Sequence, residues 1–195
     1  MLAIVDSGGA NIASVRFALE RLGVRSELTA DPAVIRAAER AILPGVGSAA
    51  EGMKRLQAKG LVDCVRGLTQ PVLGVCLGMQ LLFEHSEESD TPCLGLIPAS
   101  LQLFAKSDAL RVPHMGWNSL QIQRASPLLA GIDAGTFAYF VHSYAAPVGD
   151  YTLASCDYGG AFSAVVQQGN FYGAQFHPER SAAVGARLLE NFIKL

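Results

Sequence analysis

One stretch of the chain, residues 71–83, constrains the fold more than any other, and it reads PVLGVCLGMQLLF. Its uncharged apolar start predicts a buried strand, and the residues that follow, up to about Glu84, repeat their apolar positions with the period of a helix. Between the two lies a Gly-x-Cys-x-Gly motif, in which Gly74 and Gly78 flank Cys76 at two residues' distance. This spacing predicts a tight strand-to-helix turn, because a side chain at either glycine would collide with neighbouring backbone.

The turn would place Cys76 at the N-terminus of a helix. Unpaired backbone N–H groups there favour a thiolate and can hold a developing oxyanion. A cysteine in an apolar stretch is nevertheless usually an inert core residue, and so short a motif has many chance matches. The motif alone leaves catalysis and core packing equally open, and a base and an orienting acid elsewhere in the chain would decide between them.

Composition limits the classes of protein that need to be considered. The chain has 195 residues, of which half are hydrophobic and 16% are charged, as expected for one domain that spans residues 1–195. A net charge of −2 does not indicate the excess of basic residues that nucleic-acid-binding domains carry. The four cysteines lack C-x-x-C spacing, which argues against a zinc site and a disulfide framework. No signal peptide or bilayer-spanning apolar run is visible, so we expect a cytoplasmic protein without membrane contact.

Strand and helix patterns alternate in the first half of the chain. The expected strands cover residues 2–5, 24–28, 41–43 and 71–76, and the expected helices cover residues 12–22, 32–38, 48–59 and 61–67. Such alternation predicts a parallel sheet with flanking helices. Residues 84–92 are polar and acidic, and we expect them to form a loop. Short alternating strands with few helices then follow, before a last strand at 171–176 and a helix at 182–193, so the second half is expected to be partly antiparallel.

The last predicted strand leads into His177-Pro178-Glu179. Residues two apart in an extended segment project to the same side, so His177 and Glu179 can face one site. An imidazole beside Cys76 would take its proton, and a carboxylate behind the imidazole would fix its tautomer. An isolated His-Pro-Glu tripeptide is more typical of a surface loop. Here it follows a strand end, as Cys76 does, and sites in open α/β sheets gather at the carboxyl ends of strands.

Other candidate residues are ambiguous by themselves. The Pro44-Gly45-Val46-Gly47 segment could bring backbone N–H groups to a ligand, although an ordinary strand-to-helix loop explains it as well. His85 lies in the acidic segment and is expected to be solvated. His114 and His142 lie among aromatic residues and could be structural or part of a binding face. The remaining cysteines have no flanking glycines and are expected to be structural or exposed bystanders: Cys64, Cys93 and Cys156.

With Gly-Val-Cys-Leu-Gly-Met-Gln at 74–80 and Gln-Phe-His-Pro-Glu at 175–179, the chain resembles the class I (triad) glutamine amidotransferases over essentially its whole length. The segments at 44–47, 113–118 (PHMGWN) and 139–144 (YFVHSY) are similar to those of the glutaminase subunits of imidazole glycerol phosphate synthases. The resemblance implies a single α/β domain with a mainly parallel, flavodoxin-like open sheet and an antiparallel portion in the second half.

The resemblance also implies the roles of individual residues. Cys76 would be the nucleophile on the side-chain amide of glutamine, His177 the general base and then the acid, and Glu179 the residue that orients His177. The expected oxyanion donors are backbone N–H groups of Gly45, Val46, Gly47 and Leu77. The expected substrate contacts are Gln80, Glu88, His142, Ser143 and Tyr144. No metal or cofactor is implied.

In such enzymes the ammonia passes to a cyclase subunit, a (β/α)8 barrel that makes imidazole glycerol phosphate and an aminoimidazole carboxamide ribotide in histidine biosynthesis. This chain is too short to contain the ~250 residues of that fold, so a heterodimer is implied. Because Trp and Tyr are favoured interface anchors, the expected docking residues are Pro113, His114, Met115, Gly116, Trp117, Asn118 and Tyr139.

Three alternatives stay open at this point. The chain could be the glutaminase of another synthase, such as one for pyridoxal phosphate or anthranilate. It could be a cysteine hydrolase of peptides on a related fold, although no polymer-binding feature is visible. It could also be a binding subunit that kept the fold, although that would require a broken triad and all three members are present.

Overall fold

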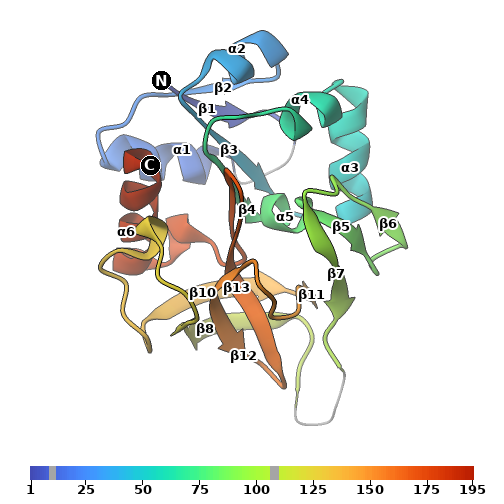
Figure 1. Ribbon diagram of the computed structural model, residues 1–195, viewed down its shortest axis with the longest axis vertical. Coiled ribbons are helices and arrows are strands. Elements are labelled where there is room, and N and C mark those ends of the chain that lie inside the picture. The colour runs from blue at the N-terminus through green and yellow to red at the C-terminus, as the bar shows by residue number, and fades with distance from the viewer. Residues whose placement is uncertain (9–11, 106–109) are drawn as a thin grey trace.

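A mixed sheet of eight strands forms the centre of the computed structural model, which describes residues 1–8, 12–105 and 110–195 (Figure 1). Five parallel neighbours come first in the strand order, and three antiparallel strands complete it. In spatial order they are β2 (Ser26–Thr29), β1 (Leu2–Val5), β3 (Arg40–Gly45), β4 (Val72–Cys76), β14 (Phe171–Ala174), β13 (Ala161–Gln168), β12 (Thr152–Asp157) and β9 (Gln121–Ile122). The predicted arrangement, parallel first and partly antiparallel later, is confirmed.

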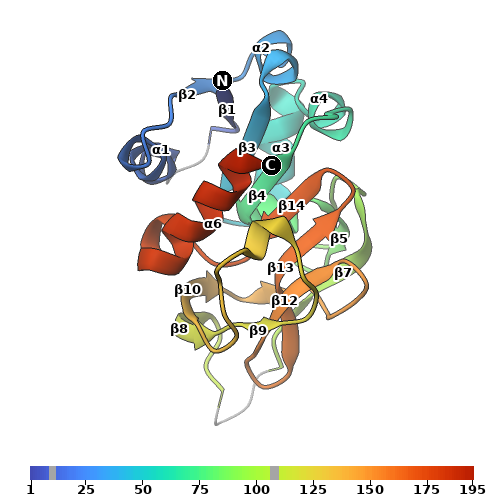
Figure 2. The ribbon, with the colours of Figure 1, turned by 60° about the vertical axis from the view of Figure 1, so that its left-hand side comes forward.

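Helices cover both faces of the parallel part. Successive residues of a strand face opposite sides of the sheet, so Ile4 packs in one apolar core and Val5 in the other. The first core includes residues of α1 (Ile12–Arg21) and α6 (Ala182–Lys194), and the second includes residues of α2 (Pro32–Ala37), α3 (Ala49–Ala58) and α4 (Val62–Arg66) (Figures 1 and 2). None of the helices in the described ranges has the length and apolar character needed to cross a bilayer.

Polar side chains cap the N-termini of two of these helices, α2 and α3. The Asp31 carboxylate accepts a hydrogen bond from the N–H of Ala33 (2.8 Å), and the Ser48 hydroxyl accepts one from the N–H of Glu51 (3.3 Å). Each cap satisfies a backbone donor that has no partner within the helix. The cap at Ser48 fixes the start of α3 directly after β3, close to the predicted oxyanion segment.

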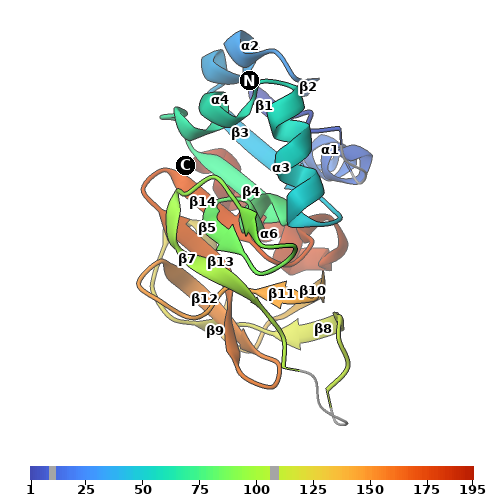
Figure 3. The same ribbon diagram turned by 90° about the vertical axis from the view of Figure 1, so that its right-hand side faces the viewer.

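Two smaller sheets lie beside the main one. Strands β8 (His114–Ser119) and β10 (Phe137–His142) form an antiparallel ribbon. The other sheet contains β11 (Tyr144–Ala145), β7 (Ile97–Leu103), β5 (Phe83–Ser86) and β6 (Thr91–Pro92) (Figure 3). Two short 3-10 turns, η1 (Pro127–Leu129) and η2 (Pro178–Arg180), complete the described elements.

The predictions for the residues after Cys76 and for the start of β2 are wrong. The helix after Cys76, α5, spans only Leu77–Gln80, and residues expected in a helix and an acidic loop form β5 and β6 instead. The apolar run 81–83 is buried in the second core, and a run that is apolar on every side does not distinguish helix from strand. Strand β2 also starts two residues later than expected, because the N–H of Val24 bonds to the carbonyl of Leu19 and closes α1.

Candidate active site

The predicted strand-to-helix turn is confirmed at Cys76, which ends β4 and precedes α5. Cys76 has φ 52° and ψ −111°, a conformation that L residues rarely adopt. A Cβ on Gly74 would lie 2.6 Å from the carbonyl oxygen of Gly78, and a Cβ on Gly78 would collide with the carbonyl oxygen of Leu43. The two glycines therefore allow three backbone segments to meet beneath the cysteine.

The strand pairing brings His177 to the same edge of the sheet. Strand β14 lies parallel to β4, with Gly173 opposite Gly74, so both strands end side by side. The imidazole Nδ1 of His177 lies 2.8 Å from Oε1 of Glu179, whose side chain is only 1% exposed. The Ser181 hydroxyl donates to the carbonyl of His177 (2.7 Å) and accepts from the N–H of Tyr139 (3.0 Å), which holds the turn in place.

Burial of His177 disfavours its imidazolium form, but other contributions outweigh this effect. Hydrogen bonds with Cys76 and Glu179, and the negative charges of both groups when ionised, raise the pKa of His177 to about 10. His177 therefore holds its second proton at neutral pH, directly beside the Cys76 sulfur. An imidazolium in that position can donate a proton to a departing group.

The other three cysteines have different surroundings, although all four are buried. Burial raises the pKa of the Cys93 thiol to about 11 and that of the Cys156 thiol to about 12, and the charges of Glu88 and Asp157 respectively add to these shifts. Burial also raises the pKa of Cys64. These three cysteines were expected to be either structural or exposed, and their burial shows that they are structural.

A cavity of about 300 Å³ opens over Cys76. Its walls come from the parallel half, from the β5–β6 turn and from the segments around the β8–β10 ribbon. The lining residues are Val46, Gly47, Cys76, Leu77, Gln80, Glu88, Pro113, Val141, His142, Ser143, Tyr144 and His177. All five predicted substrate contacts are among them. Two predicted site residues, Gly45 and Glu179, are not among the lining residues. Gly45 pairs with Cys76 in the β3–β4 ladder, and Glu179 contacts Nδ1 of His177.

Gln80 and Glu88, which are predicted substrate contacts, are hydrogen-bonded to other parts of the protein. Gln80 donates through Nε2 to the carbonyl of Tyr144 and to Oε1 of Gln175, both at 3.0 Å. Oε2 of Glu88 accepts from the N–H of Ala49 (2.7 Å), at the first turn of α3. The carboxylate of Glu88 thus connects the β5–β6 turn to the helix that follows the Gly45–Gly47 segment.

Gln175 is a residue of the site that sequence reasoning did not single out. Its side chain is fully buried, and its Nε2 lies 3.9 Å from the Cys76 sulfur. Its position two residues before His177 could have identified Gln175 as a site residue, because alternate residues of an extended segment face the same side. A buried amide at that position has to find polar partners, and here they are Gln80 and the nucleophile's own sulfur.

The expected docking residues divide between the two faces of the β8–β10 ribbon. Met115 and Trp117 are exposed, at 63% and 52%, and Tyr139 packs its ring against Trp117. The expectation for His114 needs correction, because its side chain is buried on the inner face, where its ring stacks on that of Tyr158 at 4.0 Å. Alternation along the strand separates His114 from its exposed neighbour Met115. His85, expected to be solvated, is partly exposed and contacts Asp90.

Comparison with known proteins agrees with this geometry. The family Glutamine amidotransferase class-I matches residues 3–195, and the chain therefore belongs to the class I glutamine amidotransferases. The chain is 56% identical over 194 residues to a protein of Xylella fastidiosa (strain Temecula1 / ATCC 700964) named imidazole glycerol phosphate synthase subunit HisH. A protein of the same name from Xanthomonas axonopodis pv. citri (strain 306) is 57% identical. Each match covers 100% of this chain and 97% of the relative.

The fold also matches a solved structure, described as the crystal structure of glutamine amidotransferase. The TM-score is 0.76 at 21% sequence identity, with 99% of this chain and 97% of that chain covered. The predicted family and enzyme class are confirmed by these matches. The alternatives, a glutaminase for another synthase and a peptide hydrolase, are not favoured, because both relatives carry the same subunit name.

Proposed function

We propose that this chain hydrolyses the side-chain amide of glutamine as the glutaminase subunit of an imidazole glycerol phosphate synthase. The observation that carries the proposal is the hydrogen-bonded series Cys76, His177 and Glu179 at one cavity. Its members have the residue types and the order needed for a nucleophile, an acid-base group and an orienting carboxylate.

The first half of the reaction forms a thioester. The Cys76 thiolate attacks the amide carbon, a C–S bond forms, and the carbonyl electron pair moves to oxygen. Backbone N–H groups of Leu77 and of the Gly45–Val46–Gly47 loop would hold that oxyanion, and one such donor typically contributes ~3–4 kcal/mol. When the intermediate collapses, the C–N bond breaks and the His177 imidazolium gives its proton to the departing nitrogen, which leaves as ammonia.

The second half regenerates the enzyme. Neutral His177 takes a proton from water as the oxygen attacks the thioester, and collapse of the second intermediate breaks the C–S bond. The products are glutamate and a thiolate that again faces an imidazolium. Glu179 keeps the His177 Nδ1 proton in place, so Nε2 is the atom that exchanges protons in both halves.

The polar walls of the cavity would hold the amino-acid end of glutamine. A glutamine carries an ammonium and a carboxylate on its α-carbon. The Glu88 carboxylate would provide the negative charge for the ammonium, and backbone N–H groups of the Ser143–Tyr144 segment would hold the carboxylate, since all three residues line the cavity. Gln80 and His142 complete this wall.

The partner we propose is a cyclase subunit of (β/α)8-barrel fold, which would bind against the outer face of the β8–β10 ribbon and receive the ammonia in the cytoplasm. The exposed side chains of Met115 and Trp117 support this choice, and Tyr139 packs its ring against Trp117. Two expected docking residues are placed differently, because the Asn118 side chain contacts His114 on the inner face and Pro113 lines the cavity. Gly116 lies between Met115 and Trp117 on β8. Exposed apolar groups of this size on a paired ribbon are typical of an interaction surface.

The partner would also control turnover. The Gly45–Val46–Gly47 loop can turn a peptide plane at little cost, since glycine tolerates conformations such as the φ of 99° at Gly47. One orientation points an N–H into the oxyanion position and the other points a carbonyl there. Docking of the cyclase would favour the first orientation by a population shift, which would prevent wasteful release of ammonia from the free subunit.

Reconstitution with a purified cyclase subunit tests this function. The wild-type pair should make imidazole glycerol phosphate from glutamine, whereas a pair with Cys76→Ala should make it only when an ammonium salt replaces glutamine. The ammonium arm shows that the variant still folds and docks. Product formation from glutamine by the Cys76→Ala pair would contradict the proposal.

A further inference from the structure

Two buried histidines take no part in the acyl and proton transfers described above, although one of them, His142, lines the cavity. His114 opens β8 and His142 ends β10, and the two residues lie opposite each other in the ribbon. Nε2 of His142 lies 3.1 Å from Nδ1 of His114, and Nδ1 of His142 lies 2.8 Å from the carbonyl oxygen of Tyr144. At the other end, Nε2 of His114 lies 3.4 Å from Nδ2 of Asn118.

These contacts determine where the protons are. A carbonyl oxygen only accepts, so the proton of neutral His142 lies on Nδ1, and its Nε2 must accept from Nδ1 of His114. Nε2 of His114 then accepts from the Asn118 amide. The orientation of that amide is fixed independently, because its Nδ2 donates to the carbonyl of Asp157 and its Oδ1 accepts from the N–H of Ser119, both at 2.8 Å.

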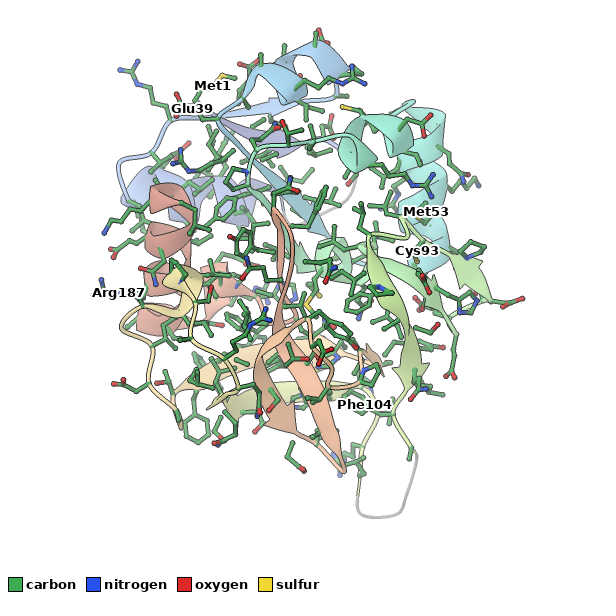
Figure 4. All side chains as sticks on the ribbon, in the orientation of Figure 1. Met1, Glu39, Met53, Cys93, Phe104 and Arg187 are labelled. Carbon is green, nitrogen blue, oxygen red and sulfur yellow. The ribbon has the colours of Figure 1, made fainter. Side chains whose placement is uncertain are left out.

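Such a directional chain requires both rings to be neutral, since an added proton would bring two N–H groups face to face. Aromatic rings surround the pair: Tyr158 stacks on His114, and Phe104 and Phe162 lie about 5 Å from His142 (Figure 4 labels Phe104). Burial lowers the pKa of His114 to about 4. Burial, together with the charges of His114 and His177, lowers that of His142 to about 3 despite its bond to Tyr144.

The chain of hydrogen bonds ends at the nucleophile. The Tyr144 carbonyl that accepts from His142 also accepts from Nε2 of Gln80, whose second N–H goes to Gln175. The Gln175 amide lies 3.9 Å from the Cys76 sulfur. Two donors therefore meet at one carbonyl, one from the antiparallel ribbon and one from the helix that follows Cys76.

We propose that His114 and His142 are positioning residues: their directional hydrogen bonds hold the Ser143–Tyr144 wall of the cavity at a fixed place relative to Cys76. The proposal rests on the glutaminase function proposed above. In this arrangement His142 acts through the Tyr144 carbonyl rather than on glutamine itself. Its loss should weaken substrate binding, whereas the thiolate and its acid stay in place.

Kinetics in the complex with the cyclase distinguish a hydrogen-bonding role from a packing role. His142→Phe keeps an aromatic ring but leaves the His114 donor without an acceptor, so KM for glutamine should rise by about tenfold to a hundredfold with a smaller change in kcat. His142→Asn keeps an N–H donor near the position of Nδ1 and should recover most of that loss. Phe162→Leu, which removes packing against His142 but no hydrogen bond, is the matched control and should leave KM unchanged.

Nitrogen-15 NMR of the imidazoles in the full wild-type chain supplies a second readout that needs no variant and no turnover. Both His114 and His142 should be neutral Nδ1–H tautomers at pH 7. An Nε2–H tautomer or an imidazolium at either residue would overturn the proposal. So would a wild-type KM in His142→Phe, or equal impairment of His142→Phe and His142→Asn. If the wild-type complex did not hydrolyse glutamine at all, the proposed function would fail, whereas the tautomer result would still test the hydrogen-bond chain.

Discussion

The two walls of the cavity are built in different ways. The wall from the parallel half is made by backbone geometry, because the glycines around Cys76 let β3, β4 and α5 approach one another, and parallel pairing places His177 beside them. The wall from the antiparallel half is held by side-chain hydrogen bonds that meet at the Tyr144 carbonyl. Changes in the first wall should therefore alter the chemical step, whereas changes in the second should alter the binding of substrate or partner.

The largest effect is expected in the first wall, at the acid-base residue. His177→Asn removes the group that protonates the departing nitrogen, and loss of one member of such a triad typically lowers kcat by a factor on the order of 10⁴ or more. KM for glutamine should change little, because the second wall is untouched. Steady-state glutaminase kinetics of the complex measure both values, and kcat close to that of the wild type would contradict the role of His177.

A smaller loss of rate, with a diagnostic pH dependence, is expected for Glu179→Gln. The bond and charge of Glu179 help to raise the pKa of His177 to about 10, so their removal lowers that pKa and the imidazolium is lost at a lower pH. The alkaline limb of the rate profile should move to lower pH.

The same shift has a consequence for folding. Because the pKa of His177 in the folded protein lies above the ordinary histidine value of 6.5, the stability contributed by protonated His177 is complete below about pH 6.5 and is lost as pH rises towards 10. Glu179→Gln should therefore reduce the free energy of unfolding most near pH 6.5, and less as the pH rises towards 10. Glu179→Asp, which retains the charge, is the control for the rate profile, and an alkaline limb that does not move would contradict the assignment.

The smallest effect is expected on the outer face of the second wall. Trp117→Ala removes an exposed aromatic anchor and should weaken binding of the cyclase by about 2 kcal/mol, with little change in the stability of the free subunit. Leu28→Ala on β2 is a matched control, since Leu28 is also exposed but lies at the far edge of the main sheet. Titration calorimetry compares them, and equal affinities for both variants would exclude this face as the docking surface.

The difference between the walls also explains what the sequence could predict. The turn at Cys76 and the alternation of strands and helices in the first half depend on residues within a few positions of each other, and local rules identify them. The motifs at residues 74–80 and 175–179 placed the chain in its family. Strand pairing then placed His177 next to Cys76 without further information.

Features that depend on distant contacts could not be predicted. Phe83 looked helical because its neighbours are apolar, and only pairing with Ile97 makes it part of a strand. The sequence leaves His114 open between a structural role and a binding face, and its burial follows from pairing with β10 and from Tyr158, 44 residues further along the chain. Neither partner can be found from spacing near these residues.

Chemical labelling of the four cysteines tests the central claim most directly. The complex would be treated with a glutamine analogue that carries an alkylating diazo ketone in place of the amide, and modified peptides would be identified by mass spectrometry. Cys76 should be labelled, glutamine should protect it, and Cys64, Cys93 and Cys156 should stay unmodified, because burial keeps their pKa values high. Labelling of another cysteine at an equal rate, or an unmodified Cys76 in an inactivated enzyme, would contradict the assignment of the nucleophile.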